Sequence, residues 1–111
     1  MNAKDRMILQ KIAGYISEAL SYTHGMSFTD FSGDTKTVNA TAFVLGQIGE
    51  LAKQISEETQ AANPHIQWRG IRGLRNRIVH DYENIDMNMF WDVVQDDLPE
   101  LETQMKKLLG Q

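Results

Sequence analysis

The stretch "ILQKIAGYISEALSYTHG", residues 8–25, decides the fold class, because its apolar side chains recur at helical spacing. They follow one another at intervals of four, three, four and three residues, at Ile8, Ile12, Tyr15, Ala19 and Tyr22. Side chains at this spacing lie on one face of an α-helix, and Gly25 follows as a C-terminal stop. The stretch therefore predicts a first helix with one buried face.

Further stretches repeat this pattern. "VLGQIGELAKQISEE", residues 44–58, carries a second apolar seam and predicts a long helix that ends at Pro64. Residues 26–35, "MSFTDFSGDT", predict a loop or short turn. A third helix is expected over 68–80 and a fourth from Asp86, as N-cap, to Leu108, with a kink or a new turn at Pro99. No segment alternates like a strand, so we expect an all-α, up-down bundle of four or five helices.

Length, composition and charge limit the possible functions. The 111 residues, of which 41% are apolar and 23% charged, predict a single domain over 1–111. The chain has no cysteine, and no stretch resembles a signal peptide or a membrane span, so we expect a cytoplasmic protein without disulfides or a membrane partner. The net charge of −4 argues against a protein that coats nucleic acid, so any RNA contact is expected to be local.

One local site is suggested by "RGIRGLRNRIVHDY", residues 69–82, because no acidic residue occurs between Glu58 and Asp81. On a continuous helix, an apolar face of Ile71, Leu74 and Ile78 would lie opposite a polar face of Arg69, Arg72, Asn76 and His80, with Arg75 at its edge and Arg77 as a fourth arginine. Guanidinium groups bind phosphate oxygens bidentately, and histidine exchanges protons near neutral pH. The stretch therefore predicts an anion site.

Simpler readings compete with this one. The arginines could form a solvated face that pairs with the eight carboxylates from Asp81 to Glu102 inclusive, and His80 could merely cap helix carbonyls. Tyr82 alone would be a half-buried aromatic residue. The histidines have no metal-ligand spacing, so we expect no metal site. The glycines within the helical patterns are expected to permit close helix approach, at Gly46, Gly49, Gly70 and Gly73.

A family resemblance favours the functional reading. Residues 75–82, "RNRIVHDY", resemble the R-x-x-x-x-H-x-Y signature of the HEPN superfamily, in its HepT-like branch of bacterial and archaeal toxins. The segments "VLGQIGELAKQISEE", "NPHIQWRGIRGLRNRIVHDY" and "IDMNMFWDVVQDDLPEL" resemble the same branch in order and spacing. The resemblance covers most of residues 35–109.

The resemblance implies a HEPN-type bundle that forms a homodimer through the motif-bearing helix. It also implies a metal-independent endoribonuclease toxin, with no cofactor, in which Arg75 and His80 are catalytic and Asn76 helps to set the site. The other arginines of the stretch are expected to bind RNA phosphates, namely Arg69, Arg72 and Arg77.

Partners follow from the same resemblance. In the family, a minimal nucleotidyltransferase antitoxin transfers AMP to the tyrosine that matches Tyr82. The alternative is an inactive helical partner of such a nucleotidyltransferase, which would bind nucleotide or substrate. Glu50 could either form an ion pair with the arginines or tune the site. A helix-turn-helix DNA-binding protein is set aside because the chain is acidic.

Overall fold

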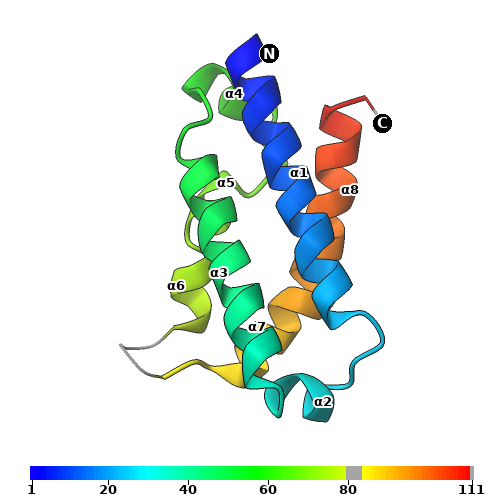
Figure 1. Cartoon of the computed structure of the whole chain (residues 1–111). Coiled ribbons are helices and arrows are strands. Elements are labelled where there is room, and N and C mark those ends of the chain that lie inside the picture. The colour runs from blue at the N-terminus through cyan, green and yellow to red at the C-terminus, as the bar shows by residue number, and fades with distance from the viewer. Residues whose placement is uncertain (80–83, 111) are drawn as a thin grey trace.

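A computed structural model of the chain describes residues 1–79 and 84–110 and is helical (Figure 1). Within these residues the backbone forms no strand, and the only sheet-like pairing is an isolated antiparallel bridge between Val79 and Ile85. The all-α prediction is confirmed. The elements are α1 Ala3–Thr23, α2 Phe28–Ser32, α3 Thr35–Ala52, α4 Glu57–Ala62, α5 Trp68–Arg72, α6 Leu74–Ile78, α7 Met87–Asp92, the π-helical turn η1 Val93–Asp97 and α8 Leu98–Leu108.

The long helices α1, α3 and α8 form the body of the bundle, with α1 packed against both α3 and α8 (Figure 1). The short helices α5 and α6 pack on α3, away from α1. The predicted seams are buried at Ile8, Ile12, Val44 and Ile48, each 6% exposed or less. In the part of the chain that the structure describes, no helix is long and apolar enough to cross a membrane.

The second predicted helix is divided in two, which corrects the expectation of one helix reaching Pro64. α3 ends at Ala52, and α4 begins after Ser56, whose hydroxyl accepts a hydrogen bond from the Thr59 amide (3.3 Å). The buried Asp5 carboxylate of α1 fixes this break. It accepts hydrogen bonds from the Ser56 amide (3.1 Å) and hydroxyl (2.5 Å) and from the Thr59 hydroxyl (2.6 Å). These donors, the two hydroxyls first, lower the pKa of Asp5 below its ordinary value of 3.8.

The third predicted helix is also divided. α5 and α6 are separated at Gly73, and α6 ends at Ile78, two residues before the expected end. Val79 is extended, with φ −103° and ψ 110°, so the helical wheel does not extend beyond Ile78. The apolar face is nevertheless buried as predicted, at Ile71, Leu74 and Ile78. His80, Asp81, Tyr82 and Glu83 lie outside the described residues, as does Gln111.

One further expectation is corrected and two are met. Residues 26–35, predicted as a loop or short turn, contain the helix α2, whose capping box is formed by Ser27 and Asp30. Asp86 caps α7 as predicted, since its carboxylate accepts a hydrogen bond from the Met89 amide (3.0 Å). η1 directly precedes α8, in which Pro99 occupies the first turn. Proline has no amide hydrogen to donate, and the widened π-helical turn lies directly before it, where a kink or a new turn was expected.

Candidate functional site

An open groove of about 350 Å³ lies between α3 and the α5–α6 pair. α5 and α6 contribute three polar side chains, while α3 contributes one helix face with two glycines. The lining residues are Phe43, Gly46, Gln47, Gly49, Glu50, Lys53, Arg72, Arg75 and Asn76. Of the residues predicted to form an anion site, the structure therefore brings together Arg72, Arg75 and Asn76.

The two glycines of α3 allow α5 and α6 to approach. A Cβ atom added to Gly49 would lie 3.0 Å from the Arg72 carbonyl oxygen, so α5 backbone occupies the space that a side chain would need. A Cβ atom added to Gly46 would lie 3.2 Å from Cδ of Arg75, so the Arg75 side chain lies across α3 at this position. The prediction of close helix approach is confirmed at these two glycines. It is wrong at Gly70 and Gly73, where an added Cβ would meet only atoms of residues 67–70.

The charges in the groove are unevenly compensated. Arg72 donates a hydrogen bond to the neutral amide of Gln60 (2.9 Å), and Arg75 has no hydrogen-bond or ion-pair partner among the described residues. Glu50, which could have paired with these arginines, instead binds Lys53, the residue that directly follows α3 (2.8 Å). Glu50 and Lys53 thus neutralise one another in the groove, while its two guanidinium groups form no ion pair with a carboxylate of the described residues. Their positive charge is what a phosphate requires.

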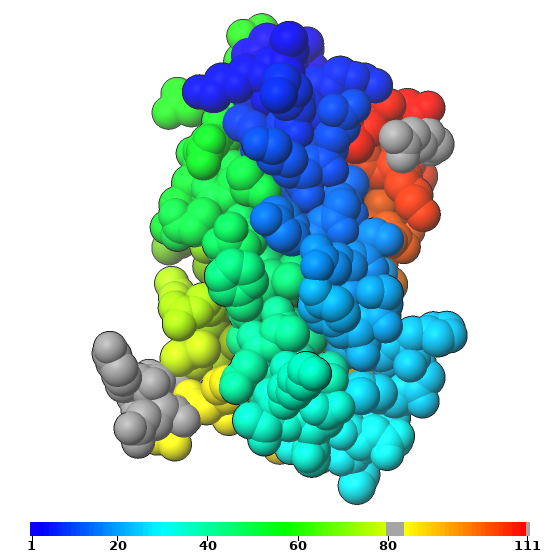
Figure 2. Space-filling view, in the orientation of Figure 1, coloured from blue at the N-terminus to red at the C-terminus, as the bar shows by residue number. Residues whose placement is uncertain are grey.

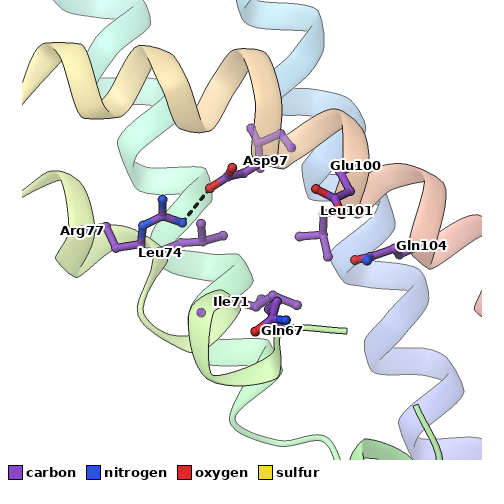
Figure 3. A pocket seen from close by; sticks show the side chains of 10 residues that line it. Gln67, Ile71, Leu74, Arg77, Asp97, Glu100, Leu101 and Gln104 are labelled. Atoms are coloured by element: carbon purple, nitrogen blue, oxygen red, sulfur yellow. Dashed lines mark hydrogen bonds and ion pairs between the residues drawn. The ribbon is translucent and has the colours of Figure 1, made fainter. Parts of the chain in front are cut away.

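The other two arginines of the stretch lie elsewhere. Arg77 forms an ion pair with Asp97 (2.6 Å) across a different pocket, between α6 and η1, as Figure 3 shows. Arg69 is exposed and lines neither the groove nor that pocket. The reading of the arginines as a face paired with downstream carboxylates thus describes Arg77 but not Arg75. Of the polar face predicted from a helical wheel, the groove therefore contains Arg72 and Asn76, together with Arg75 from the edge of that face, but not Arg69.

Two predicted site residues, His80 and Tyr82, lie outside the described residues. The segments on either side of them meet at the C-terminal end of α6. Val79 pairs with Ile85, and the Asp86 amide donates a hydrogen bond to the Ile78 carbonyl (2.7 Å). Among the residues with described positions, no group of three His, Asp or Glu side chains is arranged to hold a metal ion.

Phe43 is a groove residue that sequence reasoning missed. It is 64% exposed, the most exposed large apolar side chain among the described residues. Its position in the sequence could have indicated this exposure. Phe43 directly precedes Val44 and therefore falls outside the buried apolar face of α3. Figure 2 shows the outer surfaces of α1 and α3 side by side, and no other described element covers α3 in this view.

Comparisons with known proteins agree with the groove's chemistry. A family model described as "Ribonuclease HepT-like" matches residues 12–108. A protein of Thermococcus cleftensis named "Probable ribonuclease HepT" is 32% identical over 108 residues, which are 97% of this chain and 98% of that protein. A protein of Methanocaldococcus jannaschii whose name designates an RNase is 31% identical over 116 residues, covering 100% of this chain and 96% of the relative. No solved structure matches. The resemblance inferred from the sequence is confirmed, and the chain belongs to the HepT-like ribonuclease family.

Proposed function

We propose that this chain is a metal-independent endoribonuclease in which Arg75 and His80 form the catalytic pair. The observation that carries the proposal is the position of Arg75. Its side chain lines an open groove beside Asn76 and Arg72, and no carboxylate of the described residues forms an ion pair with it. Membership of a ribonuclease family supports RNA as the substrate. Uncompensated arginines are suited to its phosphates.

The reaction begins with the ribose 2′-hydroxyl. Its oxygen attacks the adjacent phosphorus, the bond from phosphorus to the 5′-oxygen breaks, and the products are a 2′,3′-cyclic phosphate and a free 5′-hydroxyl. His80 takes the 2′-hydroxyl proton and returns a proton to the leaving oxygen, a role worth about 10² to 10⁴ in rate. Arg75 stabilises the negative charge that builds on the phosphorane oxygens.

The active form is a homodimer in which the groove faces its copy. Phe43 supports this assignment, because an exposed phenylalanine at the edge of a charged groove is an apolar anchor of the kind that interfaces bury. A twofold axis beside α6 would place two copies of Arg75 around one cleft and double the positive charge where RNA enters. In this arrangement, the open groove of one chain is half of the site.

The physiological role is that of a toxin controlled by an antitoxin, in the manner of the toxin–antitoxin systems that the sequence resembles. A minimal nucleotidyltransferase transfers AMP to the hydroxyl of Tyr82. The added phosphate stands two residues from His80 in the sequence, so its bulk and negative charge oppose the entry of RNA. Mass spectrometry of the protein expressed with its nucleotidyltransferase tests this step, since an unmodified Tyr82 peptide contradicts it.

Cleavage of an RNA oligomer in EDTA tests the catalytic assignment. The parent protein is expected to cleave, and His80→Ala to lose at least a hundredfold in rate. Arg75→Lys is expected to lose activity because a lysine cannot reproduce the planar fork of donors. Arg6→Lys is the matched control, since Arg6 lies on α1 and lines neither this groove nor the pocket beside Arg77.

Two results would overturn the assignment. Parent-rate cleavage by His80→Ala would remove histidine from the mechanism. A folded dimer that leaves RNA intact would instead favour the non-catalytic alternative, in which the arginines bind the nucleotide of a nucleotidyltransferase complex.

A further inference from the structure

A second pocket lies on the side of α5–α6 that faces η1 and α8, whereas the groove lies on the side that faces α3 (Figure 3). Its volume is about 290 Å³, close to the lower end of the range for small-molecule sites. Four side chains give it an apolar floor, namely Ile71, Leu74, Leu98 and Leu101, and all four are buried. Leu98 follows directly on η1, and π-helical turns occur frequently at functional sites.

Three polar side chains at the rim have no partner. Those of Gln67, Glu100 and Gln104 form no hydrogen bond or ion pair within the described residues, although all three line the pocket. Figure 3 shows the Glu100 carboxylate and the Gln104 amide pointing into the space between α8 and α5–α6. The Arg77–Asp97 ion pair closes one end of the pocket and compensates both of its own charges. The uncompensated charge at the rim is therefore that of Glu100.

This combination of charge and shape selects the kind of ligand. A free phosphate is disfavoured, because the one cation in the lining is already paired and Glu100 is negative. An apolar floor suits the flat face of a nucleobase, as in other sites that receive unstacked RNA bases. A carboxylate accepts hydrogen bonds from donors on a base edge, and guanine presents two adjacent donors, N1–H and N2–H.

We propose that this pocket binds a guanine of the RNA substrate next to the cleaved phosphate. The inference rests on the proposed ribonuclease function and names the base that the same site would read. α6 joins the two regions, since it presents Arg75 and Asn76 to the groove and Leu74 and Arg77 to the pocket. A strand that crosses α6 can place a phosphate in the groove and a neighbouring base in the pocket.

Glu100→Gln is the decisive variant because it removes the carboxylate with little change in shape. It also removes a negative charge near RNA, which alone would strengthen binding to any sequence. The readout is therefore the ratio of affinities for two oligomers that differ at one base. Glu102→Gln is the matched control, since Glu102 lies on the same helix and outside this pocket.

Gly70→Ala is a second, independent probe. A Cβ atom added to Gly70 would meet only Cβ of Gln67, at 3.6 Å, which is ordinary van der Waals contact. The fold is therefore retained, as circular dichroism can verify, while a methyl group is added to the wall of the pocket. We expect this variant to lower guanine preference without lowering binding to oligomers that lack guanine.

The experiment measures binding of 2′-O-methyl RNA oligomers, which cannot be cleaved by 2′-hydroxyl attack, by fluorescence anisotropy. One oligouridine carries a single guanine, and its partner carries hypoxanthine there, which lacks the N2 amino group. The parent protein is expected to prefer guanine about tenfold, the effect of one well-placed base contact. Glu100→Gln and Gly70→Ala should bring the ratio close to one, whereas Glu102→Gln should leave it unchanged.

Equal affinities in the parent protein would overturn the inference and leave the pocket to a protein partner. A preference that survives both pocket variants would overturn it too, because guanine would then be read elsewhere. Cleavage of unmodified RNA by the same preparations separates the two proposals. A protein that cleaves without guanine preference contradicts only the pocket assignment, and one that prefers guanine without cleaving contradicts only the proposed catalysis.

Discussion

Gly49 of α3 packs directly against the backbone of α5, and replacing it with alanine tests how the groove is built. The new Cβ would lie 3.0 Å from the Arg72 carbonyl oxygen, 3.4 Å from the Ile71 carbonyl oxygen and 3.6 Å from the Arg72 carbonyl carbon. All three are backbone atoms, so no side-chain rotation relieves the contact and α5 must move as a unit. The groove that holds Arg72 and Arg75 would widen with it.

The magnitude follows from two opposing effects. Alanine in place of glycine within a helix stabilises it by about 1 kcal/mol. Overpacking a tight contact costs about 1 to 3 kcal/mol, so Gly49→Ala is expected to be destabilised by about 1 kcal/mol in total. Gly14→Ala is the matched control, because a Cβ on this α1 glycine has no neighbour within 4 Å and gains helix propensity alone.

The assay is urea unfolding at pH 7, followed by circular dichroism. The two variants should differ by about 2 kcal/mol in the free energy of unfolding, and thermal unfolding should separate them by about 8 °C. If Gly49→Ala were as stable as Gly14→Ala, the close packing of α5 on α3 would be wrong.

Three further predictions test the site, the scaffold and the assembly. Gly46→Ala should be at least as stable as the parent, because its Cβ meets only movable side-chain atoms of Arg75, Cδ at 3.2 Å and Nε at 3.9 Å. RNA cleavage should nevertheless fall about threefold to tenfold as the guanidinium group shifts. Asp5→Asn should lose about 2 kcal/mol at pH 7 in urea unfolding. Because the folded pKa of Asp5 is below 3.8, its contribution is complete above about pH 5 and lost as the pH falls through the folded value, so equal losses at pH 7 and pH 3 would contradict this. Phe43→Ser should shift light scattering from dimer to monomer, whereas Met7→Ser, at a similarly exposed position on α1, should not.

The sequence predicts those parts of the fold that depend on local pattern. The seam of α1 and the core side of α5–α6 follow from spacing alone, and Asp86 was recognisable as an N-cap. The division between α3 and α4 was not, because it depends on Asp5, 51 residues from Ser56 in the chain. The apolar periodicity continues through residues 53–56 and would allow one continuous helix. The hydrogen bonds from Ser56 and Thr59 to Asp5 therefore decide where α3 ends.

The site was predictable in its residue types but not in its grouping. Arg75 and Asn76 were identified through the family resemblance, yet a helical wheel placed Arg75 at the edge of a polar face. The structure instead places Arg75 across α3 because Gly46 has no side chain there. Arg77 turns to the opposite pocket, where Asp97 binds it. Which arginine enters which pocket depends on the helix that packs against each face of α6. The amino-acid sequence alone does not specify that packing.

The most direct test of the central claim is the chemistry of the cleaved ends. One RNA oligomer with ordinary ribose, and one with a single 2′-deoxyribose at the cleavage position, are incubated with the protein in EDTA and analysed by mass spectrometry. We predict a 2′,3′-cyclic phosphate and a 5′-hydroxyl from the first oligomer, no cleavage at the modified position of the second, and loss of product with Arg75→Lys. Cleavage at the 2′-deoxy position, or a dependence on added divalent metal, would contradict the account.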